Sequence, residues 1–117
     1  MMKTEEVNTY LSLHNQIDEL LREIISYYEK INDVYYEINN VETDENGFSV
    51  DVEFYLNHEN IYIPKELFTD ENKLNELKNR ALQAENERIL AANQKKEQQI
   101  KSEIAKAKEL LIKYGEL

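Results

Sequence analysis

Cysteine, glycine and proline are almost absent from the sequence, whose 117 residues include no cysteine, two glycines and one proline. The lack of cysteine excludes disulfides, thiolate metal sites and a cysteine nucleophile, and it is compatible with a reducing cytoplasm. The scarcity of glycine and proline leaves little room for linkers or low-complexity segments. The chain is therefore expected to consist of long regular elements.

Long apolar runs are missing as well. The N-terminus has no apolar core of about seven residues, as a secretory signal would, and no stretch reaches the roughly 18 apolar residues of a membrane span. We therefore expect no signal peptide, no contact with a membrane and a cytoplasmic location. With 41% hydrophobic residues, residues 1–117 have enough apolar material for a single domain.

Positive charge is scarce in the first half of the chain. The net charge is −10, and residues 1–60 contain 14 acidic and 3 basic side chains, whereas residues 61–117 contain 10 acidic and 11 basic ones. Such a field repels phosphate backbones, which bind proteins through lysine and arginine. Direct binding of nucleic acid is therefore not expected, and a basic protein surface is the favoured partner.

Residues 4–32 are predicted to form an amphipathic helix with a heptad repeat. Apolar positions alternate at spacings of three and four residues, which is typical of a coiled-coil seam. Leu13, Leu20 and Tyr27 recur on the adjacent flank, so the apolar stripe suits a helix that packs against more than one neighbour. The seam consists of Val7, Tyr10, His14, Ile17, Leu21, Ile24, Tyr28 and Ile31.

The apolar period changes to two between residues 34 and 63, which predicts an antiparallel sheet. In residues 48–56 the apolar side chains alternate with polar ones, as in a strand with one buried face. Residues 34–41 are expected to pair with this strand as a hairpin, because Asn46-Gly47 readily supplies the positive φ angles of a tight turn.

A short third strand is predicted at Ile61–Ile63. It follows a polar corner at Asn57–Asn60 and ends at Pro64, which cannot donate a hydrogen bond to the sheet.

A second, longer helix is predicted over residues 70–114. Thr69 or Asp70 is the expected N-cap, and Gly115 is the expected stop. Apolar residues gather at its two ends, around a polar middle at 93–103. The apolar C-terminal end needs a surface, either on the first helix or on a second copy, so a homodimer or higher oligomer is one expectation. Candidate oligomerisation residues are Ile104, Leu110, Leu111 and Tyr114.

These elements predict an α+β fold, with an N-terminal amphipathic helix, a three-stranded antiparallel sheet made of a hairpin and a short third strand, and a long C-terminal helix. Coiled-coil pairing of the helices is a further expectation.

Patterns that carry catalysis or metal binding are not found in the sequence. His14 lies on the helix seam and His58 in a polar corner, and neither belongs to a set with ligand spacing. Asp44 and Glu45 lack the alternating oxygen ligands of a calcium loop. The chain has no glycine-rich phosphate loop and no nucleophile elbow. We therefore expect a non-enzymatic protein without a metal or cofactor.

The outer face of the predicted sheet is the most informative feature. If Phe48, Val50 and Val52 point inward, alternation turns an acidic, tyrosine-rich surface outward. Tyrosine is enriched at interface hot spots, and carboxylates beside it select a basic partner. One alternative is that tyrosine simply favours strands and the carboxylates give solubility. Another is that the second helix covers this face, which would make the tyrosines core residues. Candidate partner-binding residues are Tyr35, Glu37, Asp51, Glu53, Tyr55 and Tyr62, with Asn39 and Val41 on the same expected face.

The layout of helix, Asn-Gly hairpin and long charged helix resembles small proteins encoded by bacteriophages and prophages. The most specific motif is I-x-I-P-x-E-x-L/F-x-D, present as Ile61-Tyr62-Ile63-Pro64-Lys65-Glu66-Leu67-Phe68-Thr69-Asp70. The resemblance transfers no activity and no catalytic residues. It implies an early phage product in the host cytoplasm that blocks host machinery, as anti-CRISPR and other counter-defence inhibitors do, some by imitating the charge of DNA.

Three functional hypotheses follow. The first is a phage-type inhibitor or regulator whose acidic face binds a basic site on a host protein, such as a nucleic-acid channel. The second is a structural or assembly protein that oligomerises through its helices. The third is an oligomer that sequesters a small molecule, although the shortage of lysine and arginine in the first half argues against a phosphate-bearing ligand there.

Overall fold

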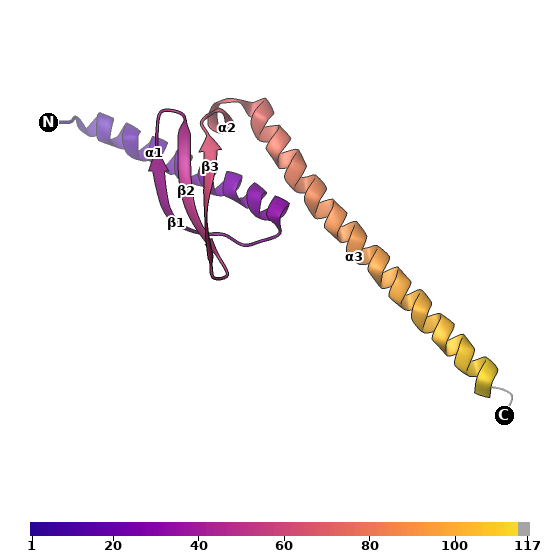
Figure 1. Cartoon of the computed structure of the whole chain (residues 1–117). Helices are drawn as coiled ribbons and strands as arrows, with labels where there is room; N and C mark the ends of the chain where they lie inside the picture. Colours follow the sequence, from indigo (N-terminus) through magenta and orange to yellow (C-terminus); the bar gives the residue numbers. More distant parts are fainter. Residues whose placement is uncertain (115–117) are drawn as a thin grey trace. The chain divides into compact units, whose positions relative to one another are not determined.

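The computed structural model describes residues 1–114 and has the predicted α+β architecture (Figure 1). An N-terminal helix precedes an antiparallel sheet, and a long helix follows it. The predicted stop at Gly115 lies outside the described residues. The elements are α1 (Thr4–Asn32), β1 (Glu37–Thr43), β2 (Gly47–Phe54), β3 (Asn57–Pro64), α2 (Glu66–Thr69) and α3 (Glu71–Tyr114).

The chain divides into two units, Met1–Gln83 and Ala84–Leu117. Among the described residues, every buried side chain belongs to the first unit, and Ala81 is the last of them. In the second unit, residues 84–114 form the C-terminal part of α3 without a buried side chain. No helix within residues 1–114 is long and apolar enough to cross a membrane.

Helix α1 has the predicted bounds, but only its C-terminal half is packed. Leu21 and Ile24 from the predicted seam are buried, together with Ile25 and Tyr27. Residues 4–19 are exposed along the whole N-terminal half. The heptad pattern therefore predicted the helix, whereas the sheet covers only its second half.

The end of α1 is fixed by hydrogen bonds that also position Tyr36, the first buried residue after the helix. Asp33 adopts a left-handed conformation with φ of 56°, and its N–H donates to the carbonyl of Glu29. The Glu29 carboxylate in turn accepts a 2.9 Å hydrogen bond from the backbone N–H of Tyr36. Asn32 Nδ2 donates to the Tyr36 hydroxyl at 2.8 Å. Tyr36 is thereby held in the core with its polar atom satisfied.

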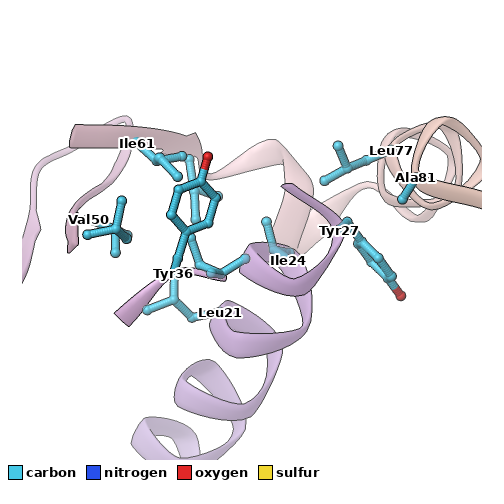
Figure 2. Close-up of a cluster of buried hydrophobic side chains, with 11 residues drawn as sticks. Leu21, Ile24, Tyr27, Tyr36, Val50, Ile61, Leu77 and Ala81 are labelled. Carbon is cyan, nitrogen blue, oxygen red and sulfur yellow. The ribbon is translucent and has the colours of Figure 1, made fainter. Parts of the chain in front are cut away.

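The sheet runs in the order β1-β2-β3 within the described residues, and both pairings are antiparallel. Its inner face packs on α1, and Leu77 and Ala81 from the start of α3 join the same core beside Tyr27 of α1 (Figure 2). Tyr36 meets Phe54 edge-to-face with 5.4 Å between ring centroids. The most deeply buried side chains are Ile24, Val50, Val52 and Ile63. Each is worth roughly 1.5–3 kcal/mol of burial, so this cluster anchors the first unit.

A β-bulge in β1 corrects the predicted alternation. Ile38 pairs with Val52, but Asn40 then pairs with Asp51, so Asn39 is an extra residue in the strand. The register beyond it is shifted by one, and Val41 pairs with Val50 on the inner face. The prediction that Val41 faces outward was therefore wrong, because a bulge reverses the parity of every later residue.

The Asn46-Gly47 turn forms where predicted but for a different reason. No glycine among the described residues has a positive φ angle. Instead, the Asp44 carboxylate accepts hydrogen bonds from the N–H groups of Asn46 at 2.7 Å and Gly47 at 2.9 Å. A Cβ atom on Gly47 would collide with the backbone carbonyl of Ile63. Glycine is therefore needed here for the close approach of β3.

The β2–β3 connection differs from the prediction. Tyr55 and Leu56 form the turn, and Tyr55 has φ of 56° in the left-handed region. Residues 57–60, expected to be a polar corner, belong to β3 and pair with β2. This turn could not be recognised from the residue types, because Tyr55 and Leu56 are neither glycine nor asparagine, the residues that usually occupy positive φ.

Two short features connect the sheet to α3. The one-turn helix α2 was not predicted, and its Phe68 packs on Phe48 with 4.7 Å between ring centroids. Asp70 Oδ1 accepts hydrogen bonds from the N–H groups of Asn72 at 3.0 Å and Lys73 at 3.4 Å. Asp70 thus caps α3 as predicted, and Leu77 and Ala81 of the first turns of α3 join the core.

Candidate docking surfaces

The outer face of the sheet is a grid of three rows across the strands. One row is Glu37, Glu53 and His58, and the next is Asn40, Asp51 and Asn60. The third row is Glu42, Ser49 and Tyr62. We call this surface the acidic sheet face. Its strands lie within residues 31–64, which contain eight acidic side chains and no lysine or arginine.

Two carboxylates of this face oppose each other directly. Glu37 and Glu53 are register partners on neighbouring strands, where like charges are destabilising. Asn39 Nδ2 donates to Glu53 Oε2 at 3.4 Å, and His58 Nε2 lies 3.8 Å from Glu53 Oε1. These neighbours offset part of the repulsion between the two carboxylates, although His58 is a cation only when it is protonated. The face therefore retains unneutralised negative charge.

Tyr62 is the aromatic residue of the acidic sheet face, and its ring is half exposed. Its hydroxyl donates a 3.0 Å hydrogen bond to Asp44 Oδ1. Partial desolvation and the Asp44 carboxylate raise the pKa of the phenol. The hydrogen bonds from the Asn46 N–H and the Tyr62 hydroxyl lower the pKa of Asp44. The phenol and the carboxylate are therefore held in one orientation, neutral and ionised respectively.

Two of the tyrosines predicted for this face lie elsewhere. Tyr35 precedes β1 and Tyr55 lies in the β2–β3 turn, although both rings are largely exposed. The structure therefore brings together Glu37, Asp51, Glu53 and Tyr62, and it places Tyr35 and Tyr55 at the margin. Within residues 1–83, α1 crosses the opposite face of the sheet and no helix covers the outer one (Figure 1).

Other tyrosines have structural roles. Tyr27 donates a 2.6 Å hydrogen bond to Glu23 Oε1, and burial together with that carboxylate raises the pKa of Tyr27 to about 12. Burial also raises the pKa of Tyr28 and of Tyr36. Tyr27 and Tyr36 belong to the core of the first unit and Tyr28 packs against it, so the tyrosines of the chain are divided between packing and surface.

An apolar groove beside α1 was missed by sequence reasoning. It has a volume of about 510 Å³ and lies between the N-terminal half of α1 and the β1–β2 hairpin. We call it the α1 groove. Its existence depends on how far α1 extends past the sheet, which periodicity cannot reveal. Its lining residues are Tyr10, Leu13, His14, Ile17, Asp18, Leu21, Val41, Thr43 and Phe48.

The predicted oligomerisation residues lie in the second unit. Ile104, Leu110, Leu111 and Tyr114 are at least half exposed on α3. Ile104, Leu111 and Tyr114 fall on one line with spacings of seven and three residues, whereas Leu110 lies beside it. A seam therefore exists in the described part of α3, without a partner that would define its use.

Among residues 1–114, no group of three or more histidine, aspartate or glutamate side chains is arranged to hold a metal ion. Within the same range, no buried side-chain nitrogen or oxygen lacks a hydrogen-bond partner.

Comparison with family models, curated proteins and solved structures found no match to this chain.

Proposed function

We propose that this protein is a non-enzymatic inhibitor or regulator that binds a basic surface of another protein through the acidic sheet face. The observation that carries the proposal is the direct pairing of Glu37 with Glu53 on a sheet segment that lacks lysine and arginine. Such an arrangement costs stability in the free protein, and a cationic partner would relieve the repulsion.

Tyr62 supports the same interpretation. An exposed phenol ring beside carboxylates combines apolar contact area with charge selectivity, which is common at the energetic centre of interfaces. If the partner is a host protein that binds nucleic acid, the carboxylates of the face take the place of phosphates. This corresponds to the counter-defence role that the resemblance to phage proteins implies, in the cytoplasm of a host cell.

The proposal predicts that replacing carboxylates of the acidic sheet face by lysine weakens binding to the partner but stabilises the free protein. In the variant Glu53→Lys, the residue facing Glu37 becomes its counter-ion, so we expect a gain of about 0.2–1 kcal/mol in the free energy of unfolding. Adding Asp51→Lys should abolish binding to the partner. Urea denaturation measures the first effect, and isothermal titration calorimetry with the purified partner measures the second.

A matched control is Glu103→Lys with Glu109→Lys, which changes the net charge equally but lies in the second unit. The partner should be sought by affinity purification from bacteria expressing the wild type and both double variants. A basic protein retained by the wild type and the control, and lost from the sheet variant, is the expected result. Equal affinity of all three proteins would reject the acidic sheet face as the docking site.

A second candidate function is assembly through α3, favoured by the exposure of Ile104, Leu111 and Tyr114 on one helical line. Sedimentation equilibrium separates the two functions. A monomer at micromolar concentration argues against assembly, whereas an oligomer that dissociates in Leu111→Gln supports it.

A further inference from the structure

The N-terminal half of α1 is an amphipathic helix that no element of the first unit encloses. Residues 4–19 are exposed, although Leu13 and Ile17 belong to its apolar side. Its apolar side is therefore available for contact with a partner.

The α1 groove gives that apolar side a second wall. Val41 and Phe48 approach from the hairpin, and Tyr10 stacks on His14 with 6.0 Å between ring centroids. Beyond the groove, the same side of α1 continues from Leu13 to Glu5 as a shallow surface of about 480 Å³, lined by α1 alone. From residue 5 to residue 21 the helix rises about 24 Å, which matches a partner helix of roughly 16 residues.

Charge along the groove is mainly negative. Residues 4–21 contain four carboxylates and no lysine or arginine. Glu5 and Glu6 line the upper end and Asp18 the lower end. Asp18 pairs with Arg22 at 3.3 Å, but both side chains are exposed, so this pair neutralises the site weakly. The groove is therefore apolar along its floor and negative at both ends.

This charge pattern argues against a second copy of the chain as the occupant. An antiparallel pair of α1 helices centred on Ser12 would place Glu5 and Glu6 of one copy beside Glu19 and Asp18 of the other. A parallel pair would place each carboxylate beside its own counterpart. Both arrangements bring like charges together at the ends of the interface, which disfavours them.

We propose that the α1 groove binds an amphipathic helix of a partner protein, whose apolar stripe is flanked by lysine or arginine. The apolar stripe lies along the floor between Tyr10 and Phe48, and the basic side chains reach Glu5, Glu6 and Asp18. This is helix-in-groove recognition, in which side chains at spacings of three and four residues provide the anchors. The surface is independent of the acidic sheet face.

The test uses the intact chain and a synthetic 16-residue helical peptide with leucines at spacings of three and four and lysines elsewhere. Leu13 and Leu11 form a matched pair, since their exposures are 51% and 50% but only Leu13 lines the groove. We expect Leu13→Gln to weaken peptide binding about tenfold and Leu11→Gln to weaken it less than about twofold. Fluorescence anisotropy of the labelled peptide measures both.

Three further measurements decide the result. A peptide with glutamates in place of lysines should bind at least about tenfold more weakly, because the ends of the groove are acidic. The double variant Asp51→Lys with Glu53→Lys should bind the lysine peptide as well as the wild type does. Far-UV circular dichroism should show that Leu13→Gln and Leu11→Gln keep the helix content of the wild type.

The proposal is overturned if the two leucine variants bind alike, or if the lysine peptide does not bind at all. Loss of binding in the Asp51→Lys, Glu53→Lys variant would place the peptide on the acidic sheet face instead. Sedimentation that shows a dimer broken by Leu13→Gln and kept by Leu11→Gln would assign the groove to a second copy and reject the partner helix.

Discussion

At the scale of single residues, the turn at Asp44–Gly47 connects all three strands. The Asp44 carboxylate binds the turn backbone and the Tyr62 hydroxyl, and the Asn46 carbonyl accepts a 2.8 Å hydrogen bond from the N–H of Lys65. Gly47 lets the β3 backbone approach. The turn therefore controls both sheet stability and the position of the exposed ring on the acidic sheet face.

Gly47→Ala should destabilise the protein. Because the new methyl group would meet the Ile63 carbonyl, we expect the free energy of unfolding to fall by about 1–3 kcal/mol, as in other cases of overpacking. Urea denaturation followed by circular dichroism measures the change. Asn46→Ala, in the same turn, should change stability by less than about 0.5 kcal/mol. A Gly47→Ala variant as stable as the wild type would show that β3 can move away without cost.

Acid should weaken the turn through Asp44. Its pKa in the folded protein lies below the ordinary value of 3.8, so the ionised carboxylate stabilises the fold above that pH. This contribution is lost as the pH falls through the lower, folded-state pKa. Asp44→Asn keeps an acceptor oxygen but has no charge to lose. We therefore expect its urea midpoint to fall less than that of the wild type between about pH 5 and pH 2.5.

Glu45→Gln provides the control for this pH experiment, since it also removes one carboxylate from the same turn. Equal pH dependence in the Asp44 and Glu45 variants would mean that the hydrogen bonds to Asp44 do not stabilise its ionised form.

At the scale of elements, α1 combines two environments in one continuous helix. Its second half is packed on the sheet, and its first half lines the α1 groove. Ile17 and Ile24 show the difference, because they are one heptad apart in the same seam. Ile24 has no exposed surface, whereas Ile17 is 40% exposed. Residues of the same type at the same heptad position therefore contribute differently to the stability of the protein.

The two isoleucines provide a test within one element. Ile24→Ala should lower the free energy of unfolding by about 2–5 kcal/mol, because it leaves a cavity in the core. Ile17→Ala should lower it by about 1 kcal/mol or less, because much of this side chain already contacts water. Thermal or urea denaturation of the isolated protein gives both values. Similar losses would mean that the first half of α1 is also buried, as in a helix pair.

At the scale of the whole molecule, charge is distributed as unevenly as burial. Residues 1–83 carry a net charge of −11, and residues 84–117 a net charge of +1. The first unit contains the described core and both candidate docking surfaces. Its negative field should speed encounters with basic partners and make their association sensitive to salt.

Periodicity was sufficient to predict the two long helices, the sheet and most of the acidic sheet face. A period of 3.6 or 2 identifies which residues share a side, and this placed Glu37, Asp51, Glu53 and Tyr62 correctly. It failed at Val41 and Tyr55, where a bulge and a turn without glycine change the backbone locally. The α1 groove could not be predicted, because it arises from the distance by which one element extends past another.

The bulge at Asn39 also affects how the sheet can meet other chains. Both β1 and β3 are outer strands, whose free N–H and C=O groups could template the addition of a foreign strand. In β1 the extra residue interrupts this template, and in β3 Pro64 offers no N–H and Glu59 adds charge. The margins of the sheet are thus protected against β-type aggregation, which leaves recognition to side chains rather than to the backbone.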